Sequence, residues 1–124
     1  MSELAIHRAV TWAYFALGGL TFAALFFVTA PYGRHTKDGW GPSVGQRLGW
    51  VLMEIPAVAL WLAIYARGSH AAEAAPLAMM GLWQLHYLQR TFIYPLRIRA
   101  GKKRTPLVVV LSATAFQTLN AWVN

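Results

Sequence analysis

Four long runs of apolar residues constrain the fold of this chain more than any other feature. They cover residues 9–30, 48–66, 75–96 and 106–123. A helix needs about 20 residues to cross roughly 30 Å of hydrocarbon, and each run approaches or exceeds that length. Only 12% of the residues are charged, against about 25% in soluble domains. We therefore predict an all-α integral membrane protein in which residues 1–124 form a single domain of four transmembrane helices.

The basic residues lie between the apolar runs and predict how the helices are oriented. The loops 31–47 and 97–104 hold eight Lys and Arg residues, against two, Arg8 and Arg67, on the other side. The positive-inside rule places both basic loops in the cytoplasm and the N-terminus outside. We expect a bacterial inner membrane, or the endoplasmic reticulum if the source is eukaryotic. The net charge of +7 is then a topology signal, and no nucleic-acid partner is expected.

The third apolar run carries a polar stripe. Residues three and four apart share a helix face, so Tyr87, Arg90 and Tyr94 lie together. An ionisable residue inside a membrane span indicates a functional site with a partner. Glu54 is that partner, because it lies about seven residues, or ~10 Å, into the second run. Arg90 precedes Arg97 by the same spacing and so lies at the same depth, next to Tyr87.

A carboxylic acid beside a phenol can donate two hydrogen bonds to one substrate oxygen. Such donors polarise a ketone, which points to Glu54 and Tyr87 as catalytic residues. Pro56 has no N–H, so the backbone carbonyl one turn before Pro56 lacks its helical donor. A free carbonyl suits a functional site better than a helix that faces lipid. The alternative is that polar residues in spans only join neighbouring helices. We favour that alternative for the amides and the imidazole of Gln84, His86, Gln89, Gln117 and Asn120.

No metal site is expected. The chain has no cysteine, and His86 has no second ligand at a useful spacing. Trp50 and Trp61 share the face of Glu54 and have the default interpretation of packing or interfacial aromatics.

Four blocks of the sequence carry a family resemblance. They are YGRHT at 32–36, WVLMEIP at 50–56, HYLQRTFIY at 86–94 and TAF at 114–116. Together they resemble the steroid 5α-reductase family (3-oxo-5α-steroid 4-dehydrogenases). Members are seven-helix membrane enzymes that reduce the 4,5 double bond of 3-keto-4-ene steroids with hydride from NADPH. The resemblance implies that the chain is the N-terminal half of a bacterial member, with its first four helices, and that the C-terminal half is its partner.

The resemblance also implies roles for individual residues. Glu54 and Tyr87 would hydrogen-bond the 3-keto oxygen of a steroid or a similar lipophilic enone. The residues expected to line the steroid pocket or its entrance are Trp50, Tyr32 and Phe116. Those expected on the NADPH side are Arg90, Tyr94 and Lys103.

Other functions remain open at this point. Related folds reduce enoyl thioesters or polyprenols. A small proton-coupled transporter would use Glu54 as its intramembrane carboxylate, although that leaves Tyr87 and Arg90 unexplained. A non-catalytic subunit that binds lipid or a protein partner is a further alternative.

Overall fold

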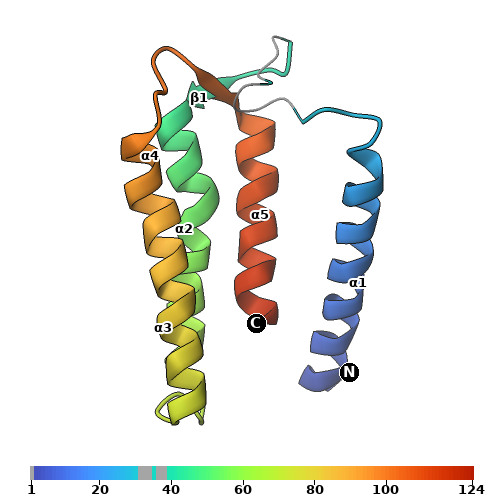
Figure 1. The fold of residues 1–124 in the computed structure, drawn as a ribbon. Coiled ribbons are helices and arrows are strands. Elements are labelled where there is room, and N and C mark those ends of the chain that lie inside the picture. Colours follow the sequence, from blue (N-terminus) through green and yellow to red (C-terminus); the bar gives the residue numbers. More distant parts are fainter. Residues whose placement is uncertain (1, 31–34, 36–38) are drawn as a thin grey trace.

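The computed structural model describes residues 2–30, 35 and 39–124, and most of them are helical (Figure 1). α1 spans Glu3–Ala24, α2 spans Gln46–Tyr65 and α5 spans Leu107–Val123. The predicted helical architecture is therefore confirmed. Among the described residues, α2 alone is long and apolar enough to cross a membrane by length and composition, while α5 is apolar but shorter. Four transmembrane spans thus remain a prediction.

The helix expected over residues 75–96 is present but is not regular. It consists of α3 (Ala74–Leu88), the π-helical turn η2 (Gln89–Ile93) and α4 (Tyr94–Arg97). The physical reason is Pro95, which has no N–H and whose ring would press on the carbonyl one turn earlier. The wider turn relieves that clash, and Tyr94 N–H donates five residues back to Gln89. Single π-helical turns often occur at functional sites.

The boundaries of the first helix differ from the expected 9–30. α1 begins at Glu3 because the Ser2 side chain caps it, accepting from Ala5 N–H at 3.3 Å. It ends at Ala24, where backbone bonds from Phe26 and Phe27 reach only three residues back. Aromatic and β-branched residues follow, and they favour helix less than the alanines before them.

A short two-stranded ladder joins the two basic loops, which the sequence had indicated to be without strands. β1 (Ser43–Gly45) pairs antiparallel with β2 (Arg104–Pro106), with Val44 opposite Thr105. Each strand leads directly into a helix, so α2 and α5 start side by side and run in the same direction (Figure 1). Gly49 permits this approach, since a Cβ there would lie 3.3 Å from the Thr105 side chain.

The buried side chains lie between α2, η2 and α5. Met53, Ala57 and Trp61 of α2 and Val110 and Ala121 of α5 are each at most 7% exposed. α1 stands to one side of α5 (Figure 1), and none of its residues is buried. Its large apolar side chains are exposed, and extended apolar surfaces of this kind mark contacts with membrane or protein.

Candidate active site

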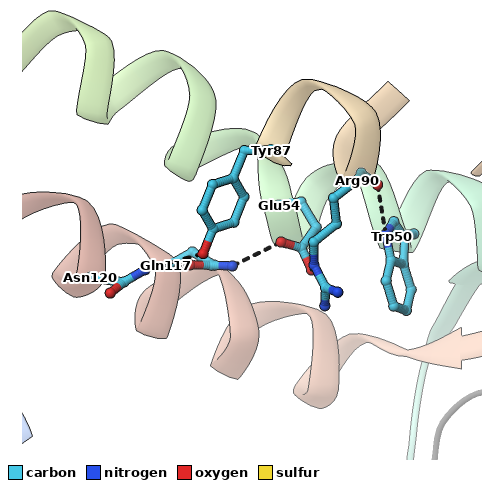
Figure 2. A network of polar contacts seen from close by, with 6 residues as sticks. All are labelled: Trp50, Glu54, Tyr87, Arg90, Gln117 and Asn120. Carbon is cyan, nitrogen blue, oxygen red and sulfur yellow. Dashed lines mark hydrogen bonds and ion pairs between the residues drawn. The ribbon is translucent and has the colours of Figure 1, made fainter. Parts of the chain in front are cut away.

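The buried carboxylate of Glu54 forms an ion pair with Arg90 across the contact between α2 and η2 (Figure 2). Arg90 Nε donates to Glu54 Oε1 at 2.8 Å. The Glu54 side chain is 6% exposed and that of Arg90 is 41% exposed, so only the carboxylate is enclosed. A carboxylate removed from water needs an opposite charge and hydrogen bonds to offset the cost. The contact predicted from the matching depths of these residues is present.

The π-helical turn explains how Trp50 joins this pair. Tyr94 N–H donates to Gln89 and Pro95 has no N–H, so the Arg90 carbonyl lacks its usual helical donors. The Trp50 indole N–H supplies one, at 3.0 Å from the Arg90 oxygen. The Trp50 ring also lies 5.0 Å from the Arg90 guanidinium carbon and 4.9 Å from the Tyr94 ring. Trp50 therefore holds the two predicted cofactor-side residues together; its predicted role in substrate binding stays a prediction.

The second oxygen of Glu54 is bound from α5. Gln117, only 8% exposed, donates from Nε2 to Glu54 Oε2 at 2.8 Å. Both carboxylate oxygens therefore accept a hydrogen bond, one from Arg90 and one from Gln117. This contact joins α5 to α2, in agreement with the sequence interpretation of Gln117 as a residue that joins helices, but the sequence analysis did not name Glu54 as its partner. The signal was available in its depth, since α2 and α5 start together and Gln117 lies about as far along α5 as Glu54 along α2.

Asn120 connects Gln117 to Tyr87. Asn120 Nδ2 donates to Gln117 Oε1 at 3.1 Å and lies 3.4 Å from the Tyr87 hydroxyl oxygen. Glu54 and Tyr87 thus occupy the two ends of one chain of polar contacts that runs through two carboxamides (Figure 2). Asn120 thus joins α5 to α3, as the sequence interpretation of a helix-joining amide expects, but its link to Tyr87 was not predicted.

Gln84 shows what a purely structural amide looks like in this protein. It is 9% exposed, nearly the same as Gln117. Its Nε2 donates to the backbone carbonyl of Val58 at 3.1 Å and so joins α3 to α2. For Gln84 the structural interpretation is confirmed.

The Tyr87 ring is fixed by its neighbours. Its centroid lies 4.7 Å from that of Trp83, which stacks in turn on Trp61 at 5.1 Å. The Trp83 indole donates to the Ala57 carbonyl at 2.8 Å, so the aromatic column is attached to α2. Tyr87 therefore has little freedom beyond rotation of its hydroxyl hydrogen.

Of the other two residues predicted for the steroid pocket, the structure describes Phe116, which makes none of the contacts of this network. Phe116 is 43% exposed and stacks on Tyr14 of α1, with ring centroids 4.9 Å apart. Tyr32 lies outside the described residues. Across the part of the chain that the structure describes, no group of three or more His, Asp or Glu side chains could hold a metal ion.

Lys103 lines a small basic pocket at the start of α2. The pocket has a volume of about 350 Å³, and its lining includes the cationic residues Arg47 and Lys103 with Gln46 and Gly101. The cap residue of α2, Gly45, offers no side-chain acceptor, and the first helical N–H, that of Gln46, donates to the Lys103 carbonyl at 3.1 Å. The positive charges of Arg47 and Lys103 suit a phosphate group. The volume of this pocket is at the small end of the range for ligand sites.

The arrangement can act on a polar oxygen brought between α2, α3 and α5. Tyr87 accepts from Asn120, and among the described residues no acceptor is found for its own hydroxyl hydrogen. A phenol whose proton is uncommitted can donate to a substrate carbonyl. The Glu54 carboxylate, which two carboxamides separate from Tyr87, is held in a fixed position by Arg90 and Gln117.

Comparison with known proteins shows which family of proteins this chain resembles. No family model matches the chain. It is 37% identical over 112 residues to steroid 5-alpha-reductase DET2 of Arabidopsis thaliana, a match of 86% of this chain and 43% of that protein. It is 30% identical over 126 residues to 3-oxo-5-alpha-steroid 4-dehydrogenase 1 of Homo sapiens, a match of 100% and 48% respectively. The chain spans about half the length of these curated relatives. By this homology, the chain belongs to the steroid 5α-reductase family.

Proposed function

We propose that this chain is the substrate-activating part of an NADPH-dependent reductase that acts on the 4,5 double bond of 3-keto-4-ene steroids. One observation carries the proposal: a buried carboxylate and a phenol are joined through two carboxamides, in a chain homologous to steroid 5α-reductases. The names of the relatives supply the substrate class. The site supplies a physical reason why a 3-keto group would be activated there.

Tyr87 is the first ketone-polarising group in this proposal. Reduction at the carbon β to the carbonyl places negative charge on the ketone oxygen. A donor already aimed at that oxygen lowers the barrier, typically by ~3 kcal/mol. Because the tilted contact with Trp83 holds its ring, Tyr87 meets this requirement without reorganising.

Glu54 is the second polarising group, and its role includes a change of partner. As the site lies, both of its oxygens accept, so it cannot also donate. It becomes a donor when it takes up a proton and Arg90 turns away. The exposure of the Arg90 side chain gives it room to do so, while Gln117 can stay on the other oxygen.

NADPH, when bound, supplies the hydride. In the proposal Arg90, Tyr94 and Lys103 lie on its side of the site. Arg90 and Lys103 provide charges that suit phosphate oxygens, and the Tyr94 ring packs against that of Trp50. Much of the cofactor site would come from the remaining half of the length that the relatives have.

We also propose that the four helical segments cross a membrane. The hydropathy of α2 and the many exposed apolar side chains support this proposal. Both described basic segments lie at one end of the molecule, with the N-terminus at the other (Figure 1). The basic end would face the cytoplasm and the N-terminus the outside, in a bacterial inner membrane or, in a eukaryote, the endoplasmic reticulum.

The test is NADPH oxidation by the complete enzyme, with identification of the product, against 4-ene-3-keto steroids, enoyl thioesters and polyprenols. Reduction of the steroids at the 4,5 bond is expected. Reduction confined to the thioesters or polyprenols would assign the site to those substrates instead. Substrate-coupled proton flux in liposomes, without NADPH oxidation, would indicate a transporter.

A further inference from the structure

The two carboxamides of α5 can be oriented in one way only. An ionised carboxylate accepts and cannot donate, so Gln117 must turn its nitrogen toward Glu54. Its oxygen then faces Asn120, which must present its own nitrogen. Asn120 nitrogen therefore also faces the Tyr87 oxygen. The charge on Glu54 thus determines the polarity of the whole chain of contacts as far as the phenol.

The contacts between Asn120 and Asn124 give the same orientation of the Asn120 carboxamide independently. Asn124 Nδ2 donates to the backbone carbonyl of Asn120 at 2.9 Å, and a carbonyl can only accept. The same nitrogen lies 3.0 Å from Asn120 Oδ1, which requires an oxygen at that position. Asn120 is therefore held with its oxygen toward Asn124 and its nitrogen toward Tyr87.

From this polarity we propose that Gln117 and Asn120 are positioning residues that direct the Tyr87 proton toward the substrate. Because the phenol oxygen accepts from Asn120, its hydrogen points away from Asn120 and is left to donate to a ketone bound beside Tyr87. At 3.4 Å the contact is long, so its main effect is to orient the hydroxyl. The inference rests on the proposed function, since it needs a carbonyl substrate at Tyr87.

The sharpest test reverses the polarity without changing the shape. In Asn120→Asp the new carboxylate accepts, so the Tyr87 hydroxyl turns toward it and away from the ketone. In Asn120→Ala the orienting contact is only removed. We expect kcat of the complete enzyme to fall about tenfold or more in Asn120→Asp, and by less in Asn120→Ala. Because the new charge also faces Gln117 Oε1 and could disturb the site by itself, this comparison is combined with the two readouts that follow.

The pH profile gives a second readout. When the carboxyl introduced by Asn120→Asp takes up a proton, it can donate again, so kcat of this variant should rise toward that of wild type as the pH falls. Wild type has no carboxyl at residue 120, and Glu54 is present in both proteins, so the ratio of the variant's kcat to that of wild type should rise as the pH falls. In a Tyr87→Phe background the hydroxyl is absent, and Asn120→Asp should then lower kcat no further.

Gln117 and Gln84 form a matched pair for the case in which Asn120→Asp does not fold. Both are buried glutamines, but Gln117 bonds to Glu54 and Gln84 to backbone. Gln117→Leu should lower kcat at least tenfold more than Gln84→Leu. Equal losses in this pair, or an equal loss in Asn120→Asp and Asn120→Ala, would overturn the inference while wild type still reduces steroids. A wild-type enzyme that reduces no enone would overturn the proposed function, and the inference with it.

Discussion

The Thr114 hydroxyl of α5 lies 3.0 Å from the Leu52 carbonyl of α2, which is the acceptor that Pro56 leaves without its helical donor. The same hydroxyl lies 2.8 Å from the Val110 carbonyl of its own helix, so it shares its proton between two helices. This contact sets the register of α5 against α2. Gln117 then lies one turn further on, opposite Glu54.

Thr114→Val keeps the shape of the side chain but removes this contact. An acceptor left without a partner costs about 1–3 kcal/mol, so we expect a loss of that size in the free energy of unfolding, measured in detergent. Thr118→Val is the control, because the Thr118 hydroxyl bonds only within α5 among the described contacts. Equal stability of the two variants would show that the Leu52 contact does not hold the helices in register.

Arg90→Leu should destabilise the protein by leaving the enclosed Glu54 carboxylate without its charge partner. The expected loss is about 1–3 kcal/mol or more, since the group left unpaired is charged. Replacing both partners, as in Arg90→Leu with Glu54→Leu, should restore much of the stability, because apolar pairs often replace buried ion pairs without loss. Thermal unfolding of the three variants checks this, and a double variant less stable than Arg90→Leu would contradict it.

Tyr87→Phe and Glu54→Gln should each reduce turnover far more than expression. Loss of one oxyanion donor typically lowers kcat by about 10²–10³, and both substitutions keep the size of the side chain. Tyr65→Phe is the control, because Tyr65 is the last residue of α2 and its phenol donates to the Ala71 carbonyl, which is not part of the contacts around Glu54. Steady-state reduction of a 4-ene-3-keto steroid is the measurement, and near-wild-type kcat in Tyr87→Phe would remove Tyr87 from the mechanism.

Single cysteines would test the proposed orientation in the membrane. The chain contains none, so Ser69→Cys and Lys102→Cys each introduce one thiol into it at an exposed loop position. In intact cells a membrane-impermeant maleimide should label Ser69→Cys, and it should label Lys102→Cys only after permeabilisation. The reverse pattern would place the basic loops outside.

The sequence by itself determined which segments are helical and which residues are chemically unusual. Long apolar runs predict helices because helix formation and hydrophobic periodicity are local properties. The contact between Glu54 and Arg90 was also predictable, since a fixed rise per residue converts position in a helix into depth. Helical spacing placed Tyr87 beside this pair, and the family blocks agreed with that placement.

Only the tertiary structure decided which helix faces meet. Spacing along α5 indicates that Gln117 and Asn120 share a side, but it does not say that this side turns toward Glu54. That rotation comes from contacts between residues far apart in the chain, namely the pairing of Val44 with Thr105 and the bond from Thr114 to Leu52. The π-helical turn at Arg90 likewise combines the local effect of Pro95 with a distant donor, Trp50. Helical geometry is dictated locally, whereas the orientation of one helix against another depends on partners that no single segment contains.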